Sequence, residues 1–443
     1  MARRAEDEVQ HYRVLGHPIA VADPGFAAML ARAHAGHSPA LCLCRSDREL
    51  PLYVTKRQSG FVLARWPGSG AQHDIGCDHY DAPDDLTGLG QVQGNAVKDD
   101  PETGDVYLKL AFPLKRGAAR SAPAAITNDT PALKHNGRKL SMRGLLHILW
   151  NKAELTHWYP RMAGKRNWFI VRRELLASAE NCFAKGVALG PRVFVPETFR
   201  LDDLTGINAR RHSALTPARL SPDTLMIVVG AVKTIGQSRY GETIGLKHLA
   251  DWPLYMDTDT AKRFHRRFAA EEDLWRSSAE DDGHLILAAS FSLRQSGSAE
   301  MFDIALMPVT REWLPYENTT ERELLRVAVT ERRSFVKGLR VDLEASRPIA
   351  NITLTDTAPQ AVAVHLAADD ETDATETARA ALIATAGVDH CSWRPGMPLP
   401  HPRHAERHST ALNAHFDNDR NGAESRSART ANASPATDQN VIA

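Results

Sequence analysis

Residues 40–81 read ALCLCRSDRELPLYVTKRQSGFVLARWPGSGAQHDIGCDHYD. The stretch begins with two cysteines one residue apart, Cys42 and Cys44. It ends with a compact cluster made of His73, Cys77 and His79. Thiolate and imidazole are ligands that a tetrahedral zinc ion takes, and structural zinc sites usually have two short ligand pairs separated by a longer loop. The spacing therefore predicts a zinc site in this stretch.

Two ligand sets fit the spacing. In the first, Cys42, Cys44, His73 and Cys77 bind the metal and His79 stays outside. In the second, Cys42-x-Cys44 pairs with Cys77-x-His79, a pattern that resembles the SWIM-type zinc finger of DNA-binding and protein-binding proteins. The 32 residues between the two pairs of that pattern make a long loop for this type, which favours His73. The competing interpretation is that the cysteines are small buried apolar residues.

Between the ligand pairs, the runs PLYVTKR and GFVLARW predict two strands joined near Gln58. A strand pair with ligands at both ends is typical of a zinc ribbon, so we expect a zinc-ribbon-like module over residues 40–81. Four protein ligands leave no open coordination position, which favours a structural zinc over a catalytic one. Ahead of the module, residues 1–37 read as mostly helical, with a short helix that Gly36 ends.

Composition limits the class of protein. The chain has 443 residues, enough for two or three domains with full cores. Five cysteines, with no apolar segment behind the opening MARRAEDEVQ, argue against a secreted disulfide scaffold and predict a cytoplasmic protein. No apolar run is long enough to span a bilayer, so we expect no membrane role. Lys plus Arg and Asp plus Glu both number 54, so any affinity for nucleic acid must come from local charge asymmetry.

Such an asymmetry exists between Lys134 and Arg173, where ten basic residues accompany one acid, Glu154. Tryptophans and other aromatic residues are interleaved with them, a mixture that can follow phosphates and stack bases. The alternative is a helix that begins after Ser141, with the aromatic rings in its core and the charges on a solvated face. The nucleic-acid interpretation predicts contacts from Arg143, Lys152, Trp158, Lys165, Arg166, Trp168, Arg172 and Arg173.

The order of predicted helices and strands indicates an α+β protein in several units. We expect an N-terminal domain over residues 1–116 that contains the zinc module, and a central basic α/β domain over residues 134–310. A low-complexity linker over residues 117–133 separates them. A third unit covers residues 311–367. Residues 368–443 are expected to form a largely disordered tail. Its acidic start, from Asp369 to Glu376, predicts a small-residue helix or tether, and residues 401–443 have almost no large apolar side chains.

The third unit resembles the core of PD-(D/E)xK nucleases, because a helix with an early acid, Glu321, precedes two strands. In that fold carboxylates on neighbouring strands hold the divalent ions that activate water. Here Asn351 and Ala363 stand at the positions of the two strand carboxylates, and His365 stands where the lysine is expected. The resemblance therefore implies a restriction-endonuclease-like unit that no longer cuts.

The motifs CLCR, HDIGC, SMRGLLHILWNKAELTHW, FVPETF and SFVKGLR occur in this order. Together they resemble a bacterial family known only as domain of unknown function 1173, over roughly residues 10–367. Members are often encoded on plasmids and other mobile elements, which implies a DNA-related setting. The resemblance supplies no catalytic residues.

The leading hypothesis is a cytoplasmic, zinc-stabilised protein of a mobile element that associates with DNA or RNA and is not an active enzyme. The first alternative is a protein-interaction or scaffold module with a structural zinc. The second alternative is an active metal-dependent nuclease.

Overall fold

The computed structural model describes residues 10–57, 60–117, 137–239, 241–278, 283–344, 347–357, 359–367 and 373–402. Most of the predicted linker, Lys134, Gln58 and the end of the predicted tail therefore lie outside the described residues. The described part contains helices and several separate sheets, which confirms a mixed α+β architecture. No helix within it combines the length and the apolar character that crossing a membrane requires.

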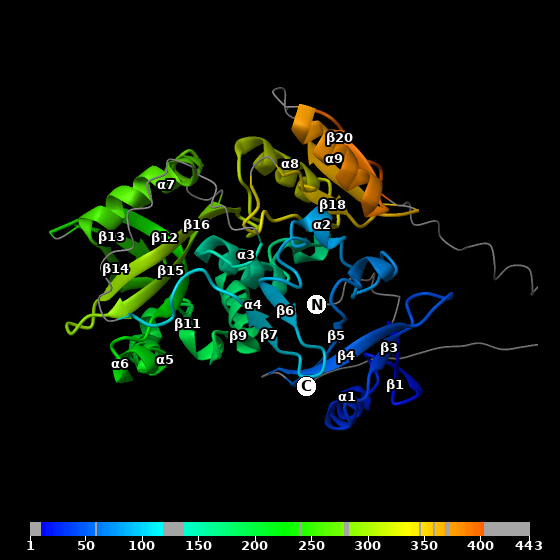
Figure 1. Ribbon diagram of the computed structural model, residues 1–443, viewed down its shortest axis with the longest axis horizontal. Helices are drawn as coiled ribbons and strands as arrows, with labels where there is room; N and C mark the ends of the chain where they lie inside the picture. Colours follow the sequence, from blue (N-terminus) through cyan, green and yellow to red (C-terminus); the bar gives the residue numbers. More distant parts are fainter. Residues whose placement is uncertain are drawn as a thin grey trace, which may run out of the picture. The chain divides into compact units, whose positions relative to one another are not determined.

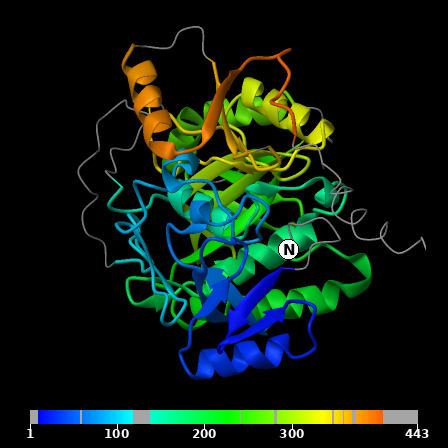
Figure 2. The ribbon, with the colours of Figure 1, turned by 90° about the vertical axis from the view of Figure 1, so that its right-hand side faces the viewer.

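The N-terminal sheet has five antiparallel strands in the order β2-β1-β3-β4-β5 (Figure 1). Its strands are β1 His11–Val14, β2 His17–Ala20, β3 Ala40–Cys42, β4 Leu50–Arg57 and β5 Gly60–Arg65. Helix α1, Phe26–Ala35, packs against β4 and β5 and ends at Gly36 as predicted. Figure 2 shows α1 beside the strands of this sheet, in dark blue. The β4–β5 hairpin confirms the predicted strand pair.

The first hairpin corrects the prediction that residues 1–37 are mostly helical. β1 and β2 are joined by Leu15 and Gly16, both at positive φ, 50° and 81°. Two consecutive residues at positive φ make the two-residue turn that suits the twist of a hairpin. Leucine in such a turn is uncommon, so the turn could not be recognised from these residues.

A second sheet has the order β10-β9-β7-β6. Its strands are β6 Val97–Asp99, β7 Val106–Leu108, β9 Cys182–Ala184 and β10 Val187–Ala188. β7 pairs with β9 in parallel, so the sheet joins segments from both sides of the predicted linker. A short helix, α2 Asp84–Thr87, precedes β6.

Two helices next to this sheet carry much of the predicted basic segment: α3, Met142–Lys152, and α4, Trp168–Glu180. The Ser141 hydroxyl accepts a hydrogen bond from the amide of Gly144, which confirms the predicted N-cap. Asp342 in turn accepts hydrogen bonds from the amide and the hydroxyl of Ser141. α3 is buried along almost its whole length, so it is a core helix.

The third sheet closes into a barrel of five strands. Its neighbours run β12-β13-β14-β16-β15, and β15 pairs again with β12. All pairs are antiparallel except β14–β16, and a short strand β11 joins β12 in parallel. The strands are β11 Val193–Phe194, β12 Met226–Ser238, β13 Gly241–Leu246, β14 Leu249–Met256, β15 Gly283–Leu293 and β16 Ala299–Thr310.

β12 closes the barrel because its two halves pair with different strands. Its residues 226–231 pair with β15, and residues 232–238 pair with β13. Gly230 lies at this change of partner, where an added Cβ would come within 2.6 Å of the Leu246 side chain. Glycine is therefore needed for the close approach of β13. The mainly antiparallel closed sheet differs from the α/β unit that we expected for the central domain.

Helix α7, Thr258–Arg276, connects β14 to β15 and packs against strands of the barrel (Figure 1). Phe264 and Phe268 on its inner face join the barrel core. Two shorter helices, α5 Leu204–Ala214 and α6 Thr216–Leu220, precede β12. Single 3-10 turns span Gly70–Gln72, Pro160–Met162, Gly190–Arg192 and Leu201–Asp203.

The C-terminal sheet has the order β20-β19-β18-β17-β8, with β19–β20 parallel and the other pairs antiparallel. The elements are β8 His157–Trp158, α8 Thr319–Thr330, β17 Phe335–Lys337, β18 Ile352–Leu354, β19 Val362–Leu366, α9 Asp373–Ala386 and β20 Asp389–Trp393. α9 and β20 fall within the predicted tail. α9 agrees with the helix or tether expected after the acidic group, whereas β20 corrects the prediction of disorder. β20 is ordered because it pairs along all of β19 and buries Trp393.

His265 on α7 ties this helix to the barrel and makes its stability depend on pH. Its Nε2 lies 2.7 Å from Glu242 on β13, and its Nδ1 lies 2.8 Å from Glu272. Burial opposes a charge on the ring, but the hydrogen bonds to the two carboxylates outweigh it and raise the pKa of His265 above 6.5. The contribution of these two contacts to the free energy of unfolding is therefore complete below about pH 6.5. It is lost as pH rises through the raised pKa of His265.

We expect His265→Gln to remove this pH-dependent part of the unfolding free energy. Urea unfolding at pH 6 and pH 9 would measure it, with His17→Gln, an exposed histidine on β2, as the matched control. An equal pH dependence in the wild type and in His265→Gln would contradict the assignment.

Candidate functional site

The four predicted zinc ligands meet in one cluster. The sulfur atoms of Cys42, Cys44 and Cys77 and a ring nitrogen of His73 all lie within 4.8 Å of one another. The Cys42–Cys77 sulfur distance is 3.6 Å, and Nδ1 of His73 lies 3.5 Å from the Cys44 sulfur and 3.7 Å from the Cys77 sulfur. Zinc–sulfur bonds of about 2.3 Å imply tetrahedral edges of about 3.8 Å. The separations therefore suit a tetrahedral ion.

Local backbone geometry brings the ligands together. Cys42 is the last residue of β3, and Cys44 follows where the chain leaves the sheet. His73 ends the 3-10 turn Gly70–Gln72 with extended backbone. A tight turn then begins at Asp74, whose carbonyl accepts from the amide of Cys77 at 2.8 Å. A metal here would cross-link β3 to the segment that follows β5.

Three N–H groups are directed at the sulfur atoms. The Gln10 side-chain amide donates to Cys77 at 2.9 Å, and the backbone amides of Asp74 and His79 donate to Cys44 and Cys77. Such donors stabilise thiolates and hold ligands in orientation. Nothing in the sequence around Gln10 indicated this role, because the residue lies more than thirty positions from the nearest cysteine.

The three thiols cannot all ionise by themselves. Hydrogen bonds from Cys42 and Cys77 hold the pKa of Cys44 far below its usual range. The hydrogen bond to Cys44 raises the pKa of Cys42 to about 11, and the hydrogen bonds to Cys42 and Cys44 raise that of Cys77 further. One thiolate is thus favoured at the expense of the others. Three neighbouring thiolates would repel one another. A bound divalent cation would offset this repulsion and allow all three thiols to ionise.

The structure separates the two histidine alternatives. Nε2 of His79 lies 3.1 Å from the Tyr12 hydroxyl, and His79 is not a member of the ligand cluster. His73 is buried and presents Nδ1 to the sulfur atoms. Three thiolates and one imidazole form a donor set that could hold a metal ion, and zinc is the metal that this set favours.

The aromatic residues of the basic segment are core residues. The side chains of Trp158 and Trp168 are only 1% and 5% exposed. Nε1 of Trp168 donates to the carbonyl of Pro196, and Trp158 is part of β8. A base cannot stack on either ring in this fold, so the two predicted stacking platforms do not form one surface with the basic residues.

Most of the predicted phosphate-binding cations have partners within the protein. Arg166 donates to the carbonyls of Leu155, Glu312 and His157, and burial lowers its pKa to about 10. All of the remaining cations except Lys165 pair with acids or carbonyls. These contacts are Arg143 with Glu317, Lys152 with Asp99, Arg172 with Glu197 and the Val195 carbonyl, and Arg173 with Glu174.

Lys165 is exposed, and the structure gives it no ion pair among the described residues. The alternative interpretation of this segment is right about the aromatic rings, which lie in the core, but most of the charges pair within the protein and do not form a simple solvated face. Contact with nucleic acid through these residues stays a prediction.

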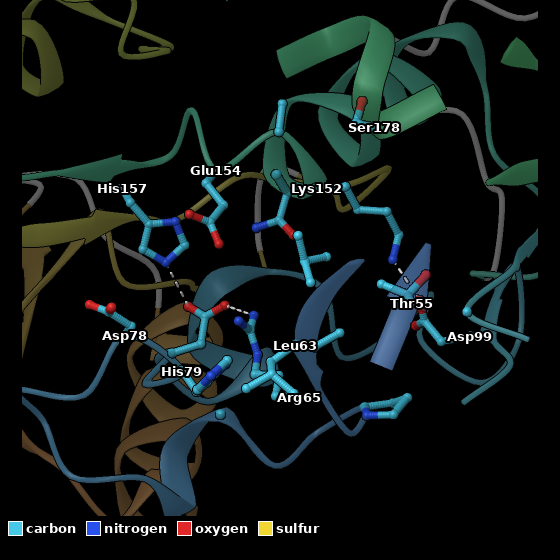
Figure 3. A pocket seen from close by; sticks show the side chains of 18 of the residues that line it. Thr55, Leu63, Arg65, Asp78, His79, Asp99, Lys152, Glu154, His157 and Ser178 are labelled. Carbon is cyan, nitrogen blue, oxygen red and sulfur yellow. Dashed lines mark hydrogen bonds and ion pairs between the residues drawn. The ribbon is translucent and has the colours of Figure 1, made fainter. Parts of the chain in front are cut away.

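A cavity of about 700 Å³ lies between the N-terminal sheet and the segment formed by α3, β8 and α4. Figure 3 shows Lys152 and His157 on one side and Leu63 and Arg65 of β5 on the other. Asp81 accepts a hydrogen bond from Arg65 and lies 3.4 Å from Nε2 of His157. The sequence did not indicate this cavity, because its walls come from three segments far apart in the chain.

Glu321 and Asn351, two residues of the unit that we predicted to be nuclease-like, are in contact with each other and with a cation. The Asn351 amide donates to Oε1 of Glu321 at 2.7 Å, and the ammonium of Lys337 lies 2.9 Å from the same oxygen. Both Glu321 and Lys337 are buried. Ala363 faces Thr353 in the β18–β19 ladder and supplies no carboxylate. Among the described residues, no acidic metal-binding group occurs in this unit.

The ligand assignment predicts a difference between two histidine variants. We expect His73→Ala and Cys44→Ser to lose bound zinc, because each removes a member of the cluster. His79→Ala should keep about one zinc per chain, because its imidazole bonds to Tyr12. Elemental analysis of the purified proteins would measure this. Zinc loss in His79→Ala, with zinc retained in His73→Ala, would contradict the assignment.

The position of Arg166 predicts a stability effect. Arg166→Ala leaves three backbone carbonyls without their donor. We expect the free energy of unfolding to fall, because a buried unsatisfied group costs about 1–3 kcal/mol. The adjacent Lys165→Ala should change the unfolding free energy by less than about 0.5 kcal/mol. Urea denaturation would compare the two. Equal effects would show that the Arg166 contacts do not stabilise the fold.

The comparisons with known proteins give one match. A model of the family described as "Protein of unknown function (DUF1173)" matches residues 12–396. No curated protein and no solved structure matches the chain at a significant level.

Proposed function

This chain belongs to the DUF1173 family, and we propose that it is a zinc-stabilised protein that binds single-stranded nucleic acid on its five-stranded barrel. The proposal moves the nucleic-acid site from the basic segment around α3 and α4 to β12, β13 and β14. In this role the zinc is structural and fixes the N-terminal sheet. A plasmid or other mobile element would supply the nucleic acid.

The connectivity of the barrel is the observation that carries the proposal. Taken in chain order, its five strands are arranged 1-2-3-5-4-1, the third and fifth are parallel, and a helix connects the third to the fourth. This arrangement supports an architecture like that of the OB-fold. OB-folds bind oligonucleotides and oligosaccharides on the face of strands 2 and 3 and on the loops 1–2 and 4–5.

The corresponding face presents a shallow platform. Gly236, Thr243 and Tyr255 lie side by side across β12, β13 and β14. A Cβ added at Gly236 would have no atom within 4 Å, so the space above the row is open. The Arg294 guanidinium lies 5.9 Å from the centre of the Tyr255 ring. An aromatic ring with a neighbouring arginine on an open face is what sequence-independent stacking of bases requires.

The loop between β15 and β16 borders this platform. Nε1 of Trp252 on β14 donates to the Gly297 carbonyl at 2.9 Å, which fixes the loop to the strand. Lys233 is exposed on the second half of β12, and Arg239 is exposed directly after the strand. These cations supply the positive charge that phosphates need next to a stacking surface. Arg294 also pairs with Glu300, which orients its guanidinium.

The proposal includes no cleavage activity. The carboxylate of Glu321 already contacts Lys337 and Asn351, and position 363 is an alanine. A hard divalent ion needs several oxygen ligands, and these residues offer one carboxylate. The nuclease-like unit is therefore proposed to have a structural role.

A second candidate function is a protein-interaction module. Several large apolar side chains are exposed between residues 199 and 220, with Leu201 at 77% and Leu220 at 81% exposure. Exposed apolar side chains near one another are typical of protein-binding surfaces. Under this alternative the barrel would contact a protein and not a nucleic acid.

The test uses a fluorescent 15-nucleotide thymidine oligomer, with binding followed by anisotropy over a series of salt concentrations. We expect Tyr255→Ala to weaken binding by about tenfold or more, because a stacked base contributes about 1–3 kcal/mol. Gly236→Glu should abolish binding without unfolding the barrel, because its side chain enters open space on the platform.

Gly25→Glu is the matched control. It adds the same charge at a position where a Cβ also has no neighbour within 4 Å, before α1. Full-length wild type that does not bind the oligomer, or Gly236→Glu that binds as well as Gly25→Glu, would contradict the proposal. If an uncharged oligosaccharide bound at the same platform, the ligand would be an oligosaccharide and not a nucleic acid.

A further inference from the structure

β5 is an edge strand of the N-terminal sheet. It pairs with β4 on one side, and the sheet order places no strand of the described chain on its other side. Arg57 and Gly60 are opposite each other and close the β4–β5 hairpin. A free strand edge presents a row of N–H and C=O groups that can pair with another extended segment.

The hairpin register indicates which groups are on that edge. In a two-residue hairpin the closing pair exchanges both hydrogen bonds, and the bonded pairs then alternate along the ladder. Counting from Gly60, residues 62 and 64 bond to β4. The backbone groups of Phe61, Leu63 and Arg65 therefore point to the outer edge.

The outer edge faces the cavity and not open solvent. All residues of β5 line the 700 Å³ cavity except Gly60, and every one of them is half-buried. The opposite wall comes from the end of α3, from β8 and from α4, as Figure 3 shows around Lys152, His157 and Ser178. The Arg57 guanidinium donates to the Ala177 carbonyl and joins the two walls at one end. The edge strand is thus one side of a cleft.

The cleft has an excess of negative charge. Four basic side chains line it, and two of these already pair with acids of the cleft, Arg65 with Asp81 and Lys152 with Asp99. The six acidic side chains that line it are Asp78, Asp81, Asp84, Asp99, Glu154 and Glu174, of which Glu174 pairs with Arg173 outside the cleft. Burial and the neighbouring Asp81 raise the pKa of Asp84, so both disfavour its ionised form. A bound cation would favour the ionised form. This charge disfavours phosphates and favours a cationic occupant.

We propose that the cleft between β5 and α4 binds an extended, cationic peptide segment, which pairs with the edge of β5 as an additional antiparallel or parallel strand. The backbone of the peptide would pair with Phe61, Leu63 and Arg65. Alternate side chains of an added strand point to opposite faces, so basic residues at every second position would lie on the same side and could reach acids of the cleft such as Asp84 and Glu154. This mode of recognition is strand addition.

The test uses full-length protein and a fluorescent seven-residue peptide that alternates lysine or arginine with valine. We expect this peptide to bind, and an acidic peptide that alternates glutamate with valine not to bind. N-methylation of alternate backbone amides of the basic peptide should weaken binding at least tenfold, because strand addition needs these donors. Hydrogen exchange should slow at the amides of residues 61–65 when the basic peptide is added.

The matched variants change two acids to amides. Asp84→Asn with Glu154→Gln removes two charges from the cleft and should weaken binding of the basic peptide about tenfold. Asp47→Asn with Glu49→Gln makes the same chemical change in the same module, at residues that do not line the cleft, and should leave binding unchanged. Zinc content and urea unfolding of both variants show that the module is folded.

Three results would overturn the proposal. They are equal binding of the basic and acidic peptides, equal binding of the N-methylated peptide, and equal effects of the two double variants. Binding of the polyamine spermine in competition with the peptide, without slower exchange at β5, would show that the cleft binds cations without adding a strand. None of these results depends on whether the barrel binds nucleic acid.

Discussion

The arrangement of the N-terminal sheet depends on the contact between three thiols and one imidazole. Cys42, Cys44, His73 and Cys77 converge within 4.8 Å, although a strand pair separates the two halves of the cluster in the chain. Without a cation, hydrogen bonding favours one thiolate and disfavours the others. A small sheet has a limited apolar core, so a metal ion held by these four side chains would add stability that burial alone provides less readily.

A metal bound at this cluster would also constrain the position of β5 and so of the cleft. β5 leads directly into the segment that carries His73 and Cys77, and Asp81 follows a few residues later to accept from Arg65. Metal binding and cleft geometry are thus connected by a short stretch of chain. The barrel, by contrast, is held by long hairpins and by the helix α7, and its proposed platform needs no metal.

Several features followed from short-range patterns. The β4–β5 hairpin, the end of α1 at Gly36 and the N-cap at Ser141 each depend on residues close together in sequence. The four members of the metal cluster were also identified by residue type and spacing. The β1–β2 hairpin was missed because Leu15 occupies a turn position that glycine or asparagine usually fills. Gln10 was missed because no motif surrounds it.

The sequence by itself determined the residue types of the candidate metal cluster, the mixed α+β class and the family to which the chain belongs. Only the tertiary structure decided between His73 and His79, because Tyr12 removes His79 from the cluster. It also showed that Trp158, Trp168 and Arg166 belong to the interior, and that β14 and β16 pair in parallel to close a barrel. These results depend on contacts between residues far apart in the chain, and local spacing carries no information about which distant partner a side chain will meet.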